Sequence, residues 1–81
     1  MDFIKLKKMI EKKYPNFEFL DKPDELFYDD YQNIVAHYRI TNDYDNRNAV
    51  FFIIGTKIKN VEFFEYYFDA RDYFVECVKV L

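Results

Sequence analysis

Several residue types that carry common chemistries are missing or scarce in this 81-residue chain. It contains no Ser and no Trp, and it has one Gly, one Cys and one His. Without Ser there is no serine nucleophile, and a lone Gly55 cannot build a glycine-rich phosphate loop. The single Cys77 excludes an internal disulfide framework, as expected in a reducing cytoplasm. We therefore expect a cytoplasmic protein whose fold is held by packing alone.

Long hydrophobic runs are also missing. No stretch approaches the roughly 20 apolar residues that cross a bilayer. The first ten residues interleave Lys5, Lys7 and Lys8 with apolar residues, so they lack the continuous apolar core of a secretory signal. A basic amphipathic helix can lie on a membrane surface, but a stripe this short is more typical of core packing. We expect no membrane partner.

Aromatic residues, in contrast, are abundant. Ten Phe and eight Tyr contribute to a hydrophobic content of 51%. This content excludes intrinsic disorder, because disordered chains are poor in aromatic and β-branched residues. No repeat or linker divides the chain, so we predict a single domain over residues 1–81.

Charge is segregated along the chain, although the formal net charge is only −3. Residues 1–13 hold five Lys and two acids, residues 14–45 hold eight acids against Lys22 and Arg39, and the remainder balances. An acidic middle third repels nucleic acid and attracts a basic partner. The same acids can equally serve to keep a very aromatic protein in solution.

Hydrophobic periodicity and turn residues predict the elements. Asp2 is a candidate N-cap for a helix that Pro15 ends, and Asp69, with Asp72 three residues on, is a candidate N-cap for a second helix that runs to Leu81. Residues 21–31 form a loop with a short strand or turn at 26–28, and 42–48 form a hairpin loop. Strands are predicted at 17–19, 33–41, 49–58 and 61–68.

The expected fold class is α+β, in the order N-terminal helix, short strand, three-stranded antiparallel meander and C-terminal helix, with the helices packed on the sheet. A two-residue turn at Lys59 and Asn60 sets the last hairpin. It places Lys57 opposite Glu62 and Phe64 opposite Gly55. Both sheet faces then become apolar, so the second face must be covered by one helix on each face, by the acidic loop folding back, by a homodimer or by a partner protein. The residues of that predicted dimer face are Phe51, Ile53, Phe64, Tyr66 and Phe68.

Catalysis and metal binding find little support. Cys77 lies on the apolar stripe of the last helix, and His37 alternates with Arg39 on a strand. Residues 43–48 begin like a calcium loop, but Arg47 stands at the fifth position and the later ligands are missing. The cluster of Asp24, Glu25, Asp29 and Asp30 lacks a nearby His or Cys ligand. We expect no enzyme activity, no metal and no cofactor.

Direct nucleic-acid binding is also disfavoured. The order helix, three strands, helix resembles the double-stranded-RNA-binding domain. However, the final helix begins Asp69-Ala70-Arg71-Asp72, which is acidic where that module presents lysines to phosphate. The lysine-rich first helix is the only basic patch.

Recognition of another protein remains. Aromatic rings supply anchoring area and carboxylates steer approach, which suits a partner with basic pockets. The segment 24–31 is the main candidate, and 43–45 forms a second patch. The predicted partner-binding residues are Asp24, Glu25, Phe27, Tyr28, Asp29, Asp30, Tyr31, Asp43, Tyr44 and Asp45.

In size, acidity and α+β style, the chain is similar to small inhibitors encoded by phages and mobile elements, including anti-CRISPR, anti-restriction and other DNA-mimic proteins. The similarity implies that carboxylates stand in for phosphates and block the nucleic-acid-binding surface of a partner. The alternative is a homodimeric structural or regulatory domain that uses the aromatic sheet face.

Overall fold

The first helix, α1 (Phe3–Lys13), begins at the predicted cap in the computed structural model, which describes residues 2–42 and 47–81. Asp2 Oδ1 accepts hydrogen bonds from the backbone N–H groups of Ile4 (3.0 Å) and Lys5 (3.3 Å). These bonds satisfy donors that have no partner within the helix. The predicted N-terminal helix is therefore confirmed.

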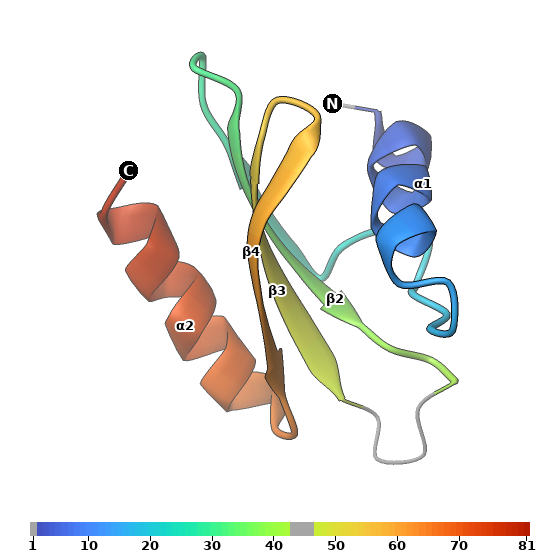
Figure 1. The fold of residues 1–81 in the computed structure, drawn as a ribbon. Coiled ribbons are helices and arrows are strands. Elements are labelled where there is room, and N and C mark those ends of the chain that lie inside the picture. Colours follow the sequence, from blue (N-terminus) through green and yellow to red (C-terminus); the bar gives the residue numbers. More distant parts are fainter. Residues whose placement is uncertain (1, 43–46) are drawn as a thin grey trace.

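Four antiparallel strands form one sheet in sequence order, β1-β2-β3-β4 (Figure 1). The predicted strand at 17–19 is wrong, because Phe19 makes only an isolated bridge to Ile40. The fourth strand is instead β1, and it coincides with the short strand or turn that was predicted at 26–28 within the loop. The strands are β1 (Glu25–Tyr28), β2 (Asn33–Arg39), β3 (Asn48–Ile54) and β4 (Lys57–Phe64).

The last hairpin turns four residues earlier than predicted. Gly55, with φ +62°, and Thr56 connect β3 to β4, so Ile53 pairs with Ile58 and Phe51 with Val61. The predicted turn at residues 59–60 and the predicted pairs of residue 57 with 62 and of 55 with 64 are therefore wrong. A left-handed backbone conformation favours glycine, and this places the turn at Gly55.

The second helix, α2 (Tyr67–Lys79), begins two residues before the predicted cap. Its N-cap is Tyr66, which makes no side-chain capping bond, so the predicted capping by Asp69 is wrong. Because β4 ends at Phe64 instead of residue 68, the chain reaches the corner earlier and the helix starts there. Asp69 lies in the first turn, where its carboxylate interacts favourably with the positive end of the helix dipole.

One helix covers each face of the sheet (Figure 1). On the α1 face, Leu6 and Ile10 pack with the strand residues that alternate toward them. On the α2 face, Ala70 and Phe74 pack on Val35 and Val50. The α+β class and the packing of helices on the sheet are thus confirmed. In the described residues, neither helix combines the length and the apolar character that a membrane crossing requires.

The predicted dimer face does not exist as one surface. Phe51 and Ile53 are fully buried in the α1 core, whereas Phe64 packs on the opposite face with Tyr73 of α2, at a ring distance of 5.3 Å. Tyr66 and Phe68 leave the sheet altogether and are exposed beside the start of α2. The one-residue register shift between Phe52 and Ile53 explains the position of Phe64, because it moves the later residues of β4 to the opposite face of the sheet, and the end of β4 at Phe64 explains why Tyr66 and Phe68 lie outside the sheet.

Candidate functional site

Two of the predicted partner-binding acids are engaged within the chain. Asp24 makes a two-pronged ion pair with Arg39, with Nε–Oδ2 at 2.7 Å and Nη2–Oδ1 at 3.2 Å. Glu25 pairs with Arg71 of α2, with Nε–Oε1 at 3.1 Å. These contacts fasten the start of β1 to β2 and to α2. The charge of each carboxylate is therefore partly balanced by an arginine of the same chain.

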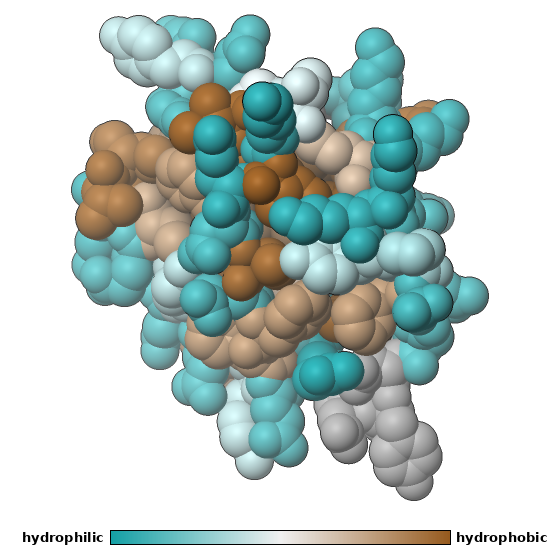
Figure 2. All heavy atoms as spheres, viewed as in Figure 1, coloured by the Kyte–Doolittle hydropathy of each residue, from teal (hydrophilic) through white to brown (hydrophobic). Residues whose placement is uncertain are grey.

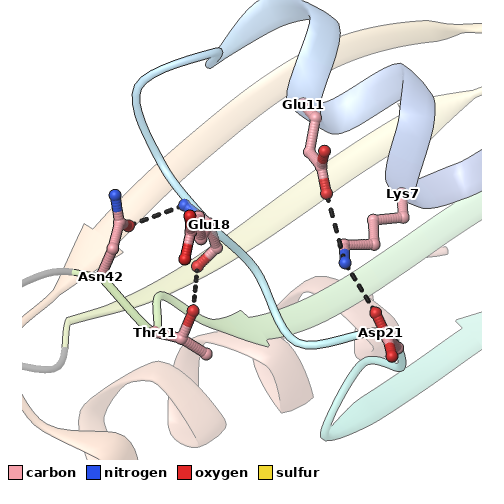
Figure 3. A network of polar contacts seen from close by, with 6 residues as sticks. All are labelled: Lys7, Glu11, Glu18, Asp21, Thr41 and Asn42. Atoms are coloured by element: carbon pink, nitrogen blue, oxygen red, sulfur yellow. Dashed lines mark hydrogen bonds and ion pairs between the residues drawn. The ribbon is translucent and has the colours of Figure 1, made fainter.

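The acidic segment before β1 is tied to α1 in the same way (Figure 3). Lys7 Nζ lies 2.7 Å from Asp21 Oδ1 and 3.4 Å from Glu11 Oε1. The hydrogen bond from Lys7 holds the pKa of the Asp21 carboxyl below its ordinary value. The backbone of Glu18 accepts from Thr41 Oγ1 at 2.9 Å. Asp21 therefore helps to hold this segment against α1.

The turn between β1 and β2, residues 29–33, is held by a dense set of hydrogen bonds. The Asp29 carboxylate accepts from the N–H of Tyr31 (2.9 Å), the N–H of Asn33 (3.0 Å) and the Asn33 side chain (2.9 Å). The bond from the Asn33 side chain is the largest cause of the lowered pKa of Asp29. Gln32 adopts φ 66° and accepts from the N–H of Gly55 at 2.9 Å. These hydrogen bonds restrict the conformations that the turn can adopt.

This turn presents two aromatic side chains and one acid to solvent. Tyr31 is 83% exposed and Tyr28 is 56% exposed. Asp30 is exposed between them and has no ion pair among the described residues. Phe27 points the other way, into the core under α2. The structure therefore brings together Tyr28, Asp29, Asp30 and Tyr31, and separates them from Asp24, Glu25 and Phe27.

The second predicted patch is not placed by the structure, since Asp43, Tyr44 and Asp45 lie outside the described residues. The candidate calcium loop at 43–48 falls largely in the same stretch. Among residues 2–42 and 47–81, no three His, Cys, Asp or Glu side chains gather as a metal site would require.

A groove beside the β1–β2 turn was not predicted. It lies between α1 and the end of the sheet, with a volume of about 650 Å³. Its lining comes from α1, from the β1–β2 turn and from the β3–β4 turn, which are distant in sequence. No local pattern could have indicated it. The residues that define its character are Lys5, Leu6, Met9, Lys12, Tyr28 and Ile34.

A second exposed aromatic cluster lies at the corner between β4 and α2. Tyr66 is 65% and Phe68 is 70% exposed, and Tyr67 lies between them with its ring 5.6 Å from that of Phe68. From the sequence, these aromatic residues were expected to lie in the last strand of the sheet. Figure 2 shows that hydrophobic atoms on the face over β4 and α2 are divided by hydrophilic side chains.

His37 and Cys77 do not form a catalytic pair. His37 is fully buried, its Nε2 lies 2.9 Å from Asn48 Oδ1, and its ring lies 5.0 Å from the ring of Tyr67. Cys77 is ten residues after Tyr67 along α2, which corresponds to about 15 Å of helix. The thiol and the imidazole therefore belong to opposite ends of the α2 core.

Comparison of the chain with protein-family models, with curated proteins and with solved structures finds no match.

Proposed function

We propose that this chain is a non-enzymatic protein-binding module that engages a basic surface through the turn at residues 28–31. The observation that carries the proposal is the display of Tyr31, 83% exposed, on a turn fixed by hydrogen bonds to Asp29 and Gln32. A large side chain on a fixed support loses little conformational entropy when it binds.

The chemistry of the turn defines the kind of partner. Tyrosine is among the residues that most often anchor protein interfaces, because its ring buries a large area and its hydroxyl can form a hydrogen bond. Asp30 supplies a carboxylate that no arginine or lysine of the described residues engages. The net charge of −3 favours approach to a basic surface.

In its finer form, the proposal makes the partner a cytoplasmic nucleic-acid-binding enzyme whose basic surface is blocked, in the manner of phage anti-CRISPR and anti-restriction inhibitors. The acidic middle third of the sequence supports this form. Among the predicted partner-binding acids, Asp24 is paired with Arg39 and Glu25 with Arg71, so the proposal assigns the role of phosphate mimics to the acids of the turn and of residues 43–45.

The test is capture of a partner from bacterial lysate, followed by competition with duplex DNA. Asp30→Lys and Tyr31→Ala change exposed side chains, so the fold should be retained, and circular dichroism verifies this. The matched control is Asp72→Lys, which makes the same charge change at an exposed site on α2. We expect the first two variants to lose capture and the control to keep it. A partner that binds all variants equally, or that DNA does not displace, would contradict the proposal.

Self-association is the second candidate function, and it would use the exposed aromatic cluster at the corner between β4 and α2. Tyr66 and Phe68 are 65% and 70% exposed, so the packing of α2 on the sheet does not account for these large side chains. Sedimentation at micromolar concentration tests it. A dimer that dissociates in Phe68→Asp, with the fold kept, would support it, and a monomeric wild-type chain would remove it.

A further inference from the structure

The groove beside α1 has the size and lining of a small-molecule site. Its volume of about 650 Å³ lies within the range of roughly 300–1,000 Å³ that is typical of ligand pockets. Leu6, Met9 and Ile34 supply an apolar lining, and the half-exposed ring of Tyr28 closes one side. Leu6 and Ile34 are only 2% and 7% exposed, so an apolar ligand body would mainly remove Met9 and Tyr28 from water.

The charged groups around the groove are not equivalent. Asp2 is occupied as the cap of α1, where it accepts from Ile4 and Lys5, and Asp29 is occupied in the β1–β2 turn. Lys5 and Lys12 have no ion pair among the described residues. Their ammonium groups are therefore the charges available to a ligand.

The two lysines lie on the same side of α1. They are seven residues apart, which is about two helical turns and about 10 Å along the axis, and Met9 lies between them. Residues 1–13 carry a net charge of +3, so the region differs in sign from the acidic remainder of the chain. The two lysines and the two aspartates of the lining balance in formal charge, so an anion would be held by direct contact with Lys5 or Lys12, whose ammonium groups have no ion-pair partner among the described residues.

We propose that the groove binds a small amphiphile, with an apolar chain or ring against Leu6, Met9 and Ile34 and a terminal carboxylate or phosphate at Lys5 or Lys12. The groove shares Tyr28 and Asp29 with the protein-binding turn, but Asp30 and Tyr31 do not line it, so substitutions at those two residues separate the two proposals. The same chemistry occurs in free acids and in lipid headgroups, so the experiment distinguishes these two sources.

The test titrates the full chain with three probes that share a ten-carbon chain, below their micelle concentrations: decanoate, decanol and decyltrimethylammonium. Isothermal calorimetry gives affinity, and the methyl NMR signal of Met9 reports the location. We expect decanoate to bind at least tenfold more tightly than the cation and to shift the Met9 signal. The double variant Lys5→Glu/Lys12→Glu should weaken decanoate at least tenfold.

The matched control is Lys8→Glu/Lys13→Glu, which makes the same charge change on α1 outside the groove lining. If both double variants weaken decanoate equally, net charge is responsible and the proposal fails. Equal binding of the three probes, or no binding, also overturns it. Attachment to phosphatidylglycerol vesicles without binding of monomeric decanoate overturns it too, because the lysines would then serve a membrane surface. Asp30→Lys and Tyr31→Ala should leave decanoate affinity unchanged, so the two proposals can fail separately.

Discussion

Removal of a single buried oxygen should stabilise this protein. Tyr38 is fully buried in the α1 core, and its hydroxyl has no hydrogen-bond partner among the described residues. Its ring meets those of Phe19 and Phe51 at 6.0 and 6.2 Å, in edge-on geometry. The variant Tyr38→Phe keeps these ring contacts and deletes only the hydroxyl.

The expected gain follows from the cost of the buried hydroxyl. A hydroxyl that leaves water without a new partner costs about 1–3 kcal/mol in proteins, and part of this is offset by the small void that its deletion leaves. We expect Tyr38→Phe to raise the free energy of unfolding by about 1 kcal/mol. For a domain of this size, that corresponds to an increase in Tm of roughly 4–8 °C.

Burial also raises the pKa of Tyr38 from 10.0 to about 12, so the folded state holds this proton more tightly than the unfolded state does. The resulting stability is complete below pH 10 and is lost as the pH rises toward 12. Urea unfolding at pH 7 and at pH 11 measures both effects. The wild type should lose more stability across this interval than Tyr38→Phe does.

Tyr31→Phe is the control, because its hydroxyl is exposed to water and its loss should change stability by less than about 0.5 kcal/mol. A Tyr38→Phe variant that is destabilised by 1 kcal/mol or more would refute the reasoning, because it would show that the hydroxyl is hydrogen-bonded in the native state.

Three further predictions concern the two turns. Gly55→Ala should destabilise the protein by about 1 kcal/mol or more in urea unfolding, because the residue has φ +62° and the new Cβ would lie 3.0 Å from Gln32 Oε1. Gln32→Gly should instead stabilise the protein by up to about 1 kcal/mol, because a non-glycine residue is strained at φ 66°. Thermal unfolding measures this gain. Asp29→Asn should make the stability of the fold less sensitive to acid. The lowered pKa of Asp29 stabilises the fold above pH 3.8, and this stability is lost as the pH falls through the native pKa; acid titration by circular dichroism tests this.

Local signals were sufficient for α1 and insufficient for the last hairpin. The N-cap Asp2 and the terminating Pro15 act within one turn of their own positions, so sequence order determines their effect. The predicted hairpin relied on a cross-strand ion pair between Lys57 and Glu62, a contact worth about 0.2–1 kcal/mol. The observed turn is set instead by Gly55, whose φ of +62° lies in the left-handed region that favours glycine.

The candidate site was predictable in composition but not in its electrostatics. The sequence indicates an acidic, aromatic segment, and the structure places Tyr28 and Tyr31 at an exposed turn. Which acids remain available depends on arginines far away in sequence. Arg71 reaches Glu25 only because α2 packs on the sheet beside β1. The groove depends on the same kind of long-range contact and has no counterpart in any local pattern.

The abundance of aromatic residues has two explanations, and the structure separates them by position. On the α1 face, rings form a connected layer at centroid distances of 5.6 to 6.3 Å, so they fill the space between helix and sheet. The members of this layer are Tyr14, Phe17, Phe19, Tyr38, Phe51 and Phe63.

The most exposed aromatics lie at the two ends of the sheet instead. Tyr28 and Tyr31 occupy the β1–β2 end, and Tyr66 and Phe68 occupy the corner before α2. Because a helix covers each face of the sheet, neither face is open to a partner, whereas the β1–β2 turn and the corner before α2 are accessible. Binding of a protein partner should therefore respond to substitutions at these ends and not to surface changes on the outer sides of α1 and α2.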